Sequence, residues 1–281
     1  MDSTDSMEAP RMRDRRVLVT GSGTGIGRGI ALEFAAEGAA VALHYSRSAD
    51  GANAAVQEIR ERGGRAEAFK ADFTRLDEVR ELGRRALEFL DGIDVLVNNA
   101  GITMDLPFEE VQPEQFDTVY GVNVRSPFFL TQTLLPAMLE QGRGVIVNIT
   151  SVHAFEGSPG HSVYAGTKGA IASYTRELAI ELAPRGIRVN AIAPGAVTVP
   201  YHYESIPGYD PDALGKMIPV GFMGVPRDVG RMAVFLASDD ARYVVGQTLI
   251  VDGGTTSWMP FSEGYRYKRS TTFGKGYVPG L

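Results

Sequence analysis

Short, continuously apolar runs alternate with longer amphipathic segments along most of this 281-residue chain. Runs that are apolar at every position are typical of strands buried on both faces of a sheet. Between the first two runs, Ile26, Ile30 and Phe34 recur every fourth residue, as on one face of a helix, and Gly38 follows as a helix stop. The runs are residues 17–19, 41–43, 94–97, 145–149, 187–192 and 248–251. Strands and helices in turn form βαβ units, whose right-handed crossovers place helices on both faces of a parallel sheet.

We therefore expect an α/β protein with a single doubly wound (Rossmann) domain over residues 13–257 and a mostly parallel seven-stranded sheet with helices on both faces. Residues 1–12 are polar and charged, and we expect a flexible N-terminal tail. Residues 258–281 form a C-terminal arm, in which aromatic and basic residues are interleaved. We expect this arm to lay its aromatic rings on its own domain or on a neighbouring subunit and to close over an active site.

The composition disfavours several classes of protein. The formal net charge is −6, whereas a nucleic-acid-binding protein usually has a basic surface, so we expect no nucleic-acid partner. The absence of cysteine excludes disulfides, thiolate nucleophiles and cysteine-ligated metal sites. No apolar run approaches the roughly 20 residues of a membrane-spanning helix, and the first residues lack the apolar core of a secretory signal. We expect no membrane partner and a cytoplasmic location.

A glycine-rich turn follows the first apolar run, with Gly21, Gly25 and Gly27 spaced as G-x-x-x-G-x-G. Such glycines let the backbone approach a pyrophosphate, and the N-terminus of the next helix offers free N–H groups and a partial positive charge. The alternative is a tight strand–helix turn that binds nothing. The position of the turn between a strand and an amphipathic helix favours a dinucleotide site. Its expected contacts are Gly21, Gly23, Thr24, Gly25, Ile26 and Gly27.

The end of the second apolar run distinguishes NADP from NAD. Enzymes that use NAD usually place Asp or Glu there to bind the ribose 2′-hydroxyl. This chain has no acidic residue from position 38 to 49, and Arg47 lies between two serines, which suits a 2′-phosphate. We therefore expect NADP, and NAD remains possible because no group repels it. The alternative is that Arg47 is a solvated loop residue. The expected contacts are Tyr45, Ser46, Arg47 and Ser48.

Tyr164 and Lys168 lie four residues apart, on one face of an expected helix. A tyrosine with a pKa of about 10 is a poor base at neutral pH, but a neighbouring ammonium or nicotinamide cation lowers that pKa. Tyr164 would then remove a proton from an alcohol or donate one to a carbonyl oxygen. Ser151 follows an apolar run, at the end of the strand where such sheets bind ligands. Its hydroxyl would hold the substrate oxygen.

Together and in order, these motifs resemble the short-chain dehydrogenase/reductase family over residues 17–254. The matching pieces are the glycine-rich turn, Ala71-Asp72, Asn98-Asn99-Ala100-Gly101, Asn123, Ser151, Tyr164 with Lys168, and Pro194-Gly195. The resemblance implies that Tyr164 is the general acid/base and that Lys168 binds the nicotinamide ribose and lowers the pKa of Tyr164. It implies that Ser151 polarises the substrate oxygen and that Asn123 holds a relay water near Lys168.

The resemblance also implies further dinucleotide contacts, from Asp72, Phe73, Asn99, Ala100, Gly101, Pro194, Gly195 and Val197. The chain departs from the family pattern at one of the neighbouring positions. The family usually has a threonine at the fifth position beyond the proline, where this chain has Val199, with Thr198 just before it. Thr198 would have to supply the usual hydroxyl contact to the nicotinamide carboxamide.

The activity implied by the resemblance is that of an NADP-preferring oxidoreductase. It would interconvert a secondary alcohol, or a sugar hemiacetal, and a carbonyl by hydride transfer. Segments such as Ser151-Val152-His153 resemble the glucose 1-dehydrogenase branch, so we expect a sugar or polyol as the small-molecule substrate, contacted by Ser151, His153 and Tyr164. The other residues expected at the substrate cleft are Glu156, His161, His202 and Tyr203. We expect no metal, because the histidines lack a third ligand and hydride transfer needs none.

Three other functions remain open, and one of them, a pure scaffold, predicts no thermal stabilisation by either dinucleotide. A reductase of 3-oxoacyl thioesters would need a basic entrance for a carrier phosphate, which Arg266, Lys268 and Arg269 of the arm could supply. A non-catalytic NADP-binding sensor would share the fold, although the intact catalytic set argues against it. The resemblance also implies a homotetramer built through two long helices, around residues 114–139 and around Tyr164. The apolar residues expected on that surface are Phe116, Tyr120, Phe128, Phe129 and Leu130.

Overall fold

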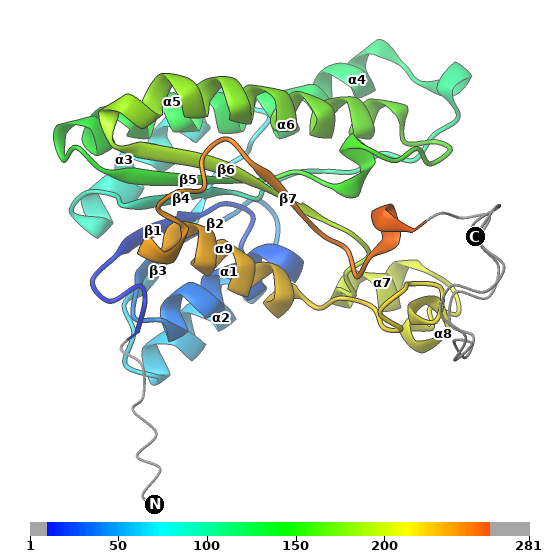
Figure 1. The fold of residues 1–281 in the computed structure, drawn as a ribbon, viewed down its shortest axis with the longest axis horizontal. Coiled ribbons are helices and arrows are strands. Elements are labelled where there is room, and N and C mark those ends of the chain that lie inside the picture. The colour runs from blue at the N-terminus through cyan, green and yellow to red at the C-terminus, as the bar shows by residue number, and fades with distance from the viewer. Residues whose placement is uncertain (1–9, 259–281) are drawn as a thin grey trace, which may run out of the picture.

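Seven parallel strands form one sheet in the order β3-β2-β1-β4-β5-β6-β7 in the computed structural model, which describes residues 10–258. The sheet confirms the expected doubly wound α/β fold, and its side-on view is shown in Figure 1. In the register, Val19 of β1 pairs with Leu43 of β2 on one side and Val97 of β4 on the other. The strands are β1 (Arg16–Val19), β2 (Ala40–Tyr45), β3 (Ala66–Lys70), β4 (Val95–Asn98), β5 (Gly144–Ile149), β6 (Ile187–Pro194) and β7 (Thr248–Val251).

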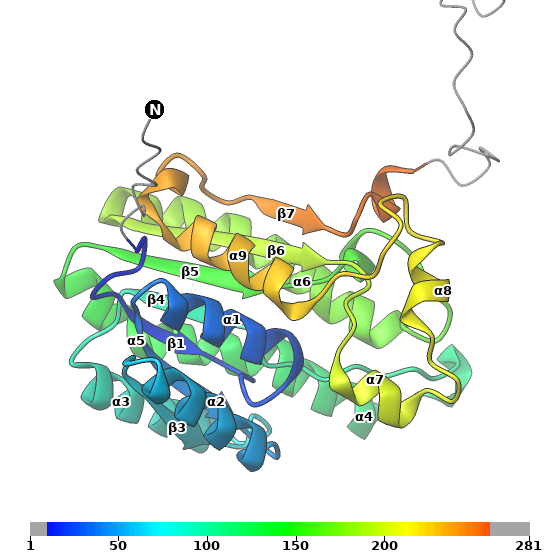
Figure 2. The ribbon, with the colours of Figure 1, turned by 90° about the horizontal axis from the view of Figure 1, so that it is seen from below.

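Helices cover both faces of the sheet, and each face has its own apolar core (Figures 1 and 2). One core contains α1 (Gly25–Ala36), α2 (Ala49–Glu61) and α9 (Pro226–Ala237). The other contains α3 (Leu76–Leu90), α5 (Ser126–Glu140) and α6 (Ser162–Leu182). Side chains alternate between the two cores along a strand, so that Val17 and Val19 face the first and Leu18 the second. This burial on both faces explains why most positions of the central strands are apolar.

The short helices gather at the carboxyl ends of the strands. These are α4 (Pro113–Tyr120), α7 (Pro200–Ser205) and α8 (Pro211–Gly215), which lie at the right of Figures 1 and 2. The chain leaves β1 towards β2 and β3 on one side and returns through β4 on the other, so the strand order reverses between β1 and β4. A ligand crevice is expected outside the carboxyl ends at such a reversal.

Three expectations about elements need correction. The strand β3 was not among the apolar runs, because its sequence Ala-Glu-Ala-Phe-Lys lies at the edge of the sheet and is only partly buried. The expected helix around residues 114–139 is divided into α4 and α5 by a π-helical turn at Gly121–Arg125. Leu130 was expected on the apolar outer surface but is fully buried in the core beneath α5.

The boundary of the N-terminal tail also differs from the expectation. Met12, which was assigned to the tail, is fully buried in the core, and its N–H donates to the Glu37 carbonyl oxygen at 3.0 Å. Arg11 forms an ion pair with the Glu37 carboxylate. The packed domain therefore begins before residue 13. The rest of the expected tail, residues 1–9, and the arm beyond Trp258 lie outside the described residues. Within residues 10–258, no helix has the length and apolar character needed to cross a bilayer.

A buried polar network joins the centre of the sheet to the helices α5 and α6. The amide of Asn98 in β4 donates to Asn148 in β5 at 2.9 Å and to the Thr131 hydroxyl at 3.1 Å. The amide of Asn148 in turn donates to the Thr175 hydroxyl at 2.9 Å. All four side chains are buried, so each hydrogen bond satisfies a group that water cannot reach. The network fixes how β4 and β5 present their carboxyl ends.

We expect Asn148→Ala to lower the free energy of unfolding by about 1–3 kcal/mol, because it leaves buried donors and acceptors of Asn98 and Thr175 unpaired. The measurement is the urea denaturation midpoint. Thr118→Ala is the matched control, since the Thr118 hydroxyl donates to the Glu114 carbonyl on an exposed face of α4. It should change stability by less than about 0.5 kcal/mol. Equal midpoints for the two variants would contradict the role of the network.

Candidate active site

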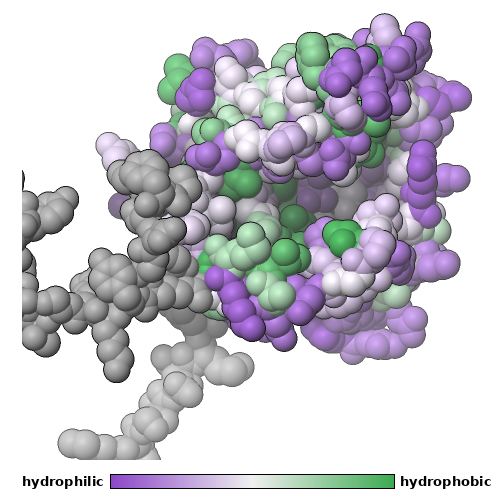
Figure 3. Space-filling model, turned by 90° about the vertical axis from the view of Figure 1, so that its right-hand side faces the viewer, coloured by the Kyte–Doolittle hydropathy of each residue, from purple (hydrophilic) through white to green (hydrophobic). Residues whose placement is uncertain are grey.

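A crevice lies outside the carboxyl ends of the central strands and consists of two adjoining cavities of about 340 and 610 Å³. Figure 3 looks onto this end of the molecule and shows the surface hollowed between the upper and lower halves. The smaller cavity extends along the ends of β4, β5 and β6, and the larger one opens towards α7 and α8. Residues that line both cavities are Ile26, Thr103, Ser151, Tyr164, Gly195 and Val199.

The glycine-rich turn borders the crevice through Ile26, and its glycines are required sterically. Gly21 has a positive φ of 64°, and a Cβ there would lie 2.9 Å from Ala100 Cα. A Cβ on Gly27 would lie 2.2 Å from the carbonyl oxygen of Gly21. At Gly23, a Cβ would lie 2.1 Å from Ser48 Oγ, because the turn lies next to the segment that follows β2. The turn therefore packs too closely for side chains and exposes backbone instead.

Hydrogen bonds hold this turn against the segment after β4. The Thr20 hydroxyl accepts the N–H groups of Asn99 and Ala100 at 2.9 and 3.0 Å. The Asn99 amide donates to the carbonyl oxygens of Thr20 and Gly21 at 2.8 and 3.1 Å. Gly101, the last residue of the expected segment, lines the smaller cavity together with Asn99. The sequence motifs around residues 20–27 and 98–101 thus form one structural unit.

His44 is a residue at this site to which the sequence assigned no role. Its Nδ1 accepts the N–H of Gly21 at 3.1 Å, and its Nε2 contacts the Ala71 carbonyl oxygen at 3.1 Å. Because a carbonyl only accepts, Nε2 carries the hydrogen and Nδ1 the lone pair. Burial lowers the pKa of His44 to about 4, which keeps the ring neutral. The signal in the sequence was a lone histidine inside an apolar strand, which is buried because β2 is covered on both faces.

The expected adenosine-binding region contains exposed cations, among them Arg47 and Arg75 near Asp72. Arg47 and Ser46 are exposed, whereas Tyr45 and Ser48 are partly buried. Asp72 accepts the N–H and the hydroxyl of Thr74, and these bonds, with a smaller contribution from Arg47, lower its pKa. Phe73 is buried and stacks on His44 with ring centroids 4.3 Å apart. Phe73 thus packs against the histidine that contacts the turn.

Ser151, Tyr164 and Lys168 meet where the two cavities join. Ser151 follows β5 and hydrogen bonds with Tyr164, and its Oγ accepts the N–H of His153 at 3.2 Å. The Lys168 ammonium lies 5.5 Å from the centroid of the Tyr164 ring and donates to the Ile149 carbonyl oxygen at 2.9 Å. Helix α6 carries both Tyr164 and Lys168, as the four-residue spacing predicted.

The pKa values of these groups correct one expectation. We expected the Lys168 ammonium to lower the pKa of Tyr164. Instead, burial raises the pKa of Tyr164 above its usual value, and the hydrogen bond with Ser151 offsets this only in part. Burial also lowers the pKa of Lys168 to about 8, and the ammonium is held by the carbonyl of Ile149. The protein alone therefore favours a protonated phenol, a proton donor, at neutral pH.

Asn123 is positioned by the π-helical turn between α4 and α5. Its side chain accepts the N–H of Ile102 at 2.8 Å and donates to the Ile102 carbonyl at 2.9 Å and to the Thr167 hydroxyl at 3.1 Å. A Cβ on Gly101 would lie 3.2 Å from Asn123 Oδ1 and 3.6 Å from Lys168 Nζ. Asn123 therefore fixes the segment that borders Lys168. Insertions of this π-helical kind often occur at functional sites.

The segment after β6 places the Val199 side chain at the crevice and the Thr198 hydroxyl against Tyr209. Pro194 and Gly195 line the crevice, and Val197 lines the larger cavity. Val199 lines both cavities, and a Cβ on Gly25 would lie 3.3 Å from its Cγ1. The Thr198 hydroxyl instead hydrogen bonds with the hydroxyl of Tyr209 at 3.0 Å. An apolar side chain thus occupies the crevice where the family usually has a hydroxyl.

Besides Ser151 and Tyr164, five residues were expected to border the substrate, and three of them line the larger cavity. His153, His161 and His202 line it. Glu156 is exposed on the loop before α6, and Tyr203 is exposed on α7 with its ring against Tyr209, so neither lines the cavity. The sequence missed the apolar wall, because it comes from the irregular segments around α8. Its residues include Leu214, Met217, Ile218 and Met223.

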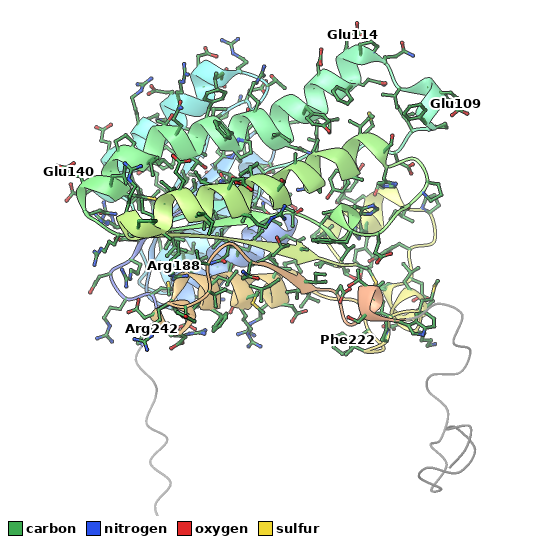
Figure 4. The ribbon with its side chains drawn as sticks, turned by 45° about the horizontal axis from the view of Figure 1, so that its top comes forward. Glu109, Glu114, Glu140, Arg188, Phe222 and Arg242 are labelled. Carbon is green, nitrogen blue, oxygen red and sulfur yellow. The ribbon has the colours of Figure 1, made fainter. Side chains whose placement is uncertain are left out.

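Figure 4 orients the two ends of the molecule. Phe222 lies on the segment after α8, at the end that carries the crevice, and Glu109 and Glu114 lie at the outer side of the segment around α4. Arg188 and Arg242 lie at the opposite end. Within residues 10–258, no three His, Asp or Glu side chains gather closely enough to hold a metal ion.

The residues present fit a nicotinamide dinucleotide. The glycine turn forms a cradle that a Cβ would fill, and no described side chain caps the N-terminus of α1 at Gly25. That helix end can therefore bind a pyrophosphate. The smaller cavity continues from Ile26 past Asn99 to Pro194 and Lys168. It could hold the ribose and nicotinamide beside Tyr164.

Comparisons with known proteins agree with this geometry. The family model described as enoyl-(acyl carrier protein) reductase matches residues 21–256. Hydroxynaphthalene reductase-like protein Arp2 of Metarhizium brunneum is 38% identical over 265 residues, which are 90% of this chain and 99% of that protein. The 3-oxoacyl-(acyl-carrier-protein) reductase FabG of Staphylococcus epidermidis is 39% identical over 241 residues, 86% of this chain and 98% of that protein. A short-chain dehydrogenase from Burkholderia cenocepacia, solved with NADP, has a TM-score of 0.80 at 34% identity, over 86% of this chain and 98% of that one.

We expect Gly27→Ala to abolish the rise in melting temperature that NADP produces, because its Cβ would lie 2.2 Å from the Gly21 carbonyl oxygen and force the turn open. Overpacking of this kind also costs about 1–3 kcal/mol of stability. Gly157→Ala is the matched control, since no described atom lies within 4 Å of its Cβ and its φ is not positive. A normal NADP-dependent shift in the Gly27 variant would show that the turn does not bind the dinucleotide.

Proposed function

Since this chain belongs to the short-chain dehydrogenase/reductase family and is an oxidoreductase that uses NAD(P), we propose that it interconverts a secondary alcohol and a ketone with NADP as the preferred cofactor. The observation that carries this proposal is the meeting of Ser151, Tyr164 and Lys168 at the junction of the two cavities. One cavity suits the dinucleotide and the other a substrate, and the proton donor lies between them.

The side chains of this chain handle the proton. In the reducing direction, the Tyr164 hydroxyl donates its proton to the ketone oxygen while Ser151 holds that oxygen. In the oxidising direction, Tyr164 removes the proton of the alcohol. When bound, the dinucleotide supplies or accepts the hydride at the substrate carbon, and its oxidised ring adds a positive charge near the phenol. The raised pKa of Tyr164 favours the reducing direction at neutral pH, because the phenol stays protonated.

Lys168 supplies a positive charge that no carboxylate of residues 10–258 pairs with. Its side chain is buried, and within residues 10–258 its ammonium forms a hydrogen bond only to the Ile149 carbonyl oxygen. This charge stabilises negative charge that develops on the phenol oxygen as the proton leaves. Lys168 also lines the smaller cavity, where its remaining ammonium hydrogens would bind the nicotinamide ribose. Lys168 would therefore contribute both to binding of the cofactor and to proton transfer by Tyr164.

The preference for NADP rests on Arg47. Its exposed side chain lies near Asp72, at the end of β2 and next to the glycine turn through Ser48. An arginine there offers a planar set of donors to a 2′-phosphate. The solved relative from Burkholderia cenocepacia contains NADP, which is consistent with this assignment.

The substrate cavity supports a compound with both hydroxyl groups and an apolar frame. Three histidines agree with the sugar or polyol expected from the glucose 1-dehydrogenase resemblance, but Leu214, Met217 and Met223 form an apolar wall. A sugar with a hydroxyl on every carbon would leave hydroxyls unpaired against that wall. We therefore favour a less hydroxylated compound, with sugars and polyols kept as members of the substrate panel.

A second candidate activity is the reduction of 3-oxoacyl thioesters. It is supported by the apolar wall and by the similarity to the FabG of Staphylococcus epidermidis. The basic residues proposed for a carrier phosphate, around Arg266, lie outside the described residues. Parallel assays with 3-oxoacyl thioesters and simple ketones, each with NADPH, separate the two activities.

A homotetramer fits the surface of α4 and α5. Phe116 and Phe128 are 42% and 46% exposed there, which is unusual for phenylalanine. Tyr120 and Phe129, also expected on this face, are partly buried. An oligomer would cover these rings, and light scattering after size exclusion tests the assembly.

We expect Tyr164→Phe to lower kcat about 10²–10⁴-fold, because the variant keeps the ring but lacks the transferable proton. NADP should still raise the melting temperature of this variant, because Lys168 and the glycine turn are unchanged. The measurement is NADPH-dependent ketone reduction beside thermal unfolding. Undiminished reduction by the variant would overturn the proposal, and turnover in the wild type excludes the non-catalytic sensor.

We expect kcat/KM for ketone reduction to fall as the pH rises through about 8. Lys168, whose pKa is lowered to about 8, is charged below that pH and loses its proton above it. Tyr164 does not set this limit, because its raised pKa keeps the phenol protonated over the same range. The profile is measured from pH 6 to 10 with NADPH, alongside thermal melts that detect unfolding. A flat profile across pH 8 would contradict the assignment.

We expect Arg47→Ala to raise the Kd of NADP about 10–100-fold, as removal of a charge-assisted contact predicts. The Kd of NAD should change less than about threefold, because NAD has no 2′-phosphate. Arg62→Ala is the control, since Arg62 is an exposed arginine that pairs with Glu58 on the same helix. Fluorescence titration measures both constants. Equal losses for the two dinucleotides would refute the NADP assignment.

A further inference from the structure

Two histidines in the substrate cavity form a stacked pair beside Tyr164. The ring centroids of His153 and His161 are 4.8 Å apart and their planes differ by 22°. Both rings meet the Tyr164 ring edge-on, at 5.5 Å for His153 and 6.3 Å for His161. Both residues line the larger cavity. Neither imidazole takes part in the proposed proton transfer, so the role of the two histidines has to be explained separately.

The hydrogen bond of His161 fixes its tautomer. Its Nδ1 lies 2.8 Å from the carbonyl oxygen of Pro159. A carbonyl oxygen only accepts, so Nδ1 carries the hydrogen and donates it. The Asp105 carboxylate lies 4.0 Å from the same nitrogen and favours a hydrogen there as well. In the neutral ring, Nε2 is therefore left with a lone pair and acts as an acceptor.

The environment of His153 favours the opposite arrangement. Its Nδ1 is buried and has no hydrogen-bond partner among residues 10–258, which leaves Nε2 as the ring nitrogen that can reach the cavity. Burial and the neighbouring His161 lower the pKa of His153, so the ring is neutral. A hydrogen on buried Nδ1 would be unsatisfied, whereas a hydrogen on Nε2 can find a partner in the cavity. The neutral ring of His153 therefore offers Nε2–H as a donor.

We infer that this histidine pair recognises a hydroxyl group that the substrate carries near its reacting carbon, an inference that rests on the proposed function. A hydroxyl accepts a hydrogen bond from His153 and at the same time donates one to His161. A carboxylate can only accept and an ammonium can only donate, so each satisfies one imidazole alone. The short distances from both rings to Tyr164 place this hydroxyl on the carbon next to the carbonyl or one further away.

The rest of the cavity specifies the remainder of the substrate. Leu214, Met217 and Met223 present apolar surface, so the carbon frame beyond the hydroxyl is apolar. The inferred substrate class is therefore a 2- or 3-hydroxyketone, or the corresponding diol, with an otherwise apolar frame. A site built to pair with a hydroxyl discriminates strongly against an analogue that lacks it, because its polar groups are then left unpaired.

The test compares matched ketones with NADPH at pH 7.5. The pairs are 2-hydroxycyclohexanone against 2-methylcyclohexanone, and hydroxyacetone against 2-butanone, which replace the hydroxyl by a methyl group of similar size. We expect the wild-type kcat/KM to be at least about tenfold higher for the hydroxyketone of a pair, as one or two hydrogen bonds predict. His153→Phe and His161→Phe keep a flat ring in the stack and should bring this ratio close to one.

Two further variants separate recognition from packing. His161→Gln retains an acceptor and should keep part of the preference, whereas Met217→Leu changes the apolar wall and should change kcat/KM for both members of a pair by a similar factor. NADP-dependent melting shifts show whether each variant is folded and binds the cofactor. If a phenylalanine variant fails to fold, the wild-type ratio and the Gln variant still decide the question.

The outcomes distinguish this inference from the proposed function. Equal kcat/KM for both members of each pair, or reduction of other ketones but of neither hydroxyketone, would overturn the hydroxyl recognition and leave the oxidoreductase proposal intact. Absence of turnover with any ketone or alcohol of the substrate panel, with NADPH or NADP, would overturn the proposed function itself. A wild-type preference that both phenylalanine variants abolish supports the inference.

Discussion

The ammonium of Lys168, enclosed between β5 and α6, is the charge on which the site depends. It donates to the carbonyl oxygen of Ile149, and the Thr150 hydroxyl donates to the carbonyl of Lys168 itself, so the strand and the helix hold each other in place. Burial makes this charge costly, which is why the pKa of Lys168 falls to about 8. The same burial reduces the screening of the charge by solvent, and the ammonium lies 5.5 Å from the centroid of the Tyr164 ring.

The strand order of the central sheet positions the other segments that border the site. Because the strand order reverses between β1 and β4, the glycine turn and the segment after β4 meet at one edge, joined by Thr20 and Asn99. His44 braces the turn from the next strand through the N–H of Gly21. The buried network through Asn98 and Asn148 holds β4 and β5 in register below them. The smaller cavity is thus bordered by segments that these hydrogen bonds tie to the core.

The substrate part is built differently. Its walls come from the turn after Ser151, from the loop before α6 and from the irregular segments around α7 and α8. Such loops vary among proteins of one fold without disturbing the core. This explains how relatives named for hydroxynaphthalene and for oxoacyl-carrier substrates share more than a third of their residues with this chain. In this chain, the stacked imidazoles of His153 and His161 are the polar feature of a wall that is otherwise largely apolar.

The sequence by itself determined the doubly wound sheet and the spacing of Tyr164 and Lys168, because both depend on periodicity along one segment. It did not reveal the edge strand β3, whose partial burial leaves no continuous apolar run, or the π-helical turn that positions Asn123. Tertiary structure alone decided the direction of the pKa of Tyr164, the bond from Thr198 to Tyr209 and the pairing of His153 with His161. Those properties depend on burial and on contacts between segments distant along the chain or on irregular loops, and no local pattern of residue types encodes them.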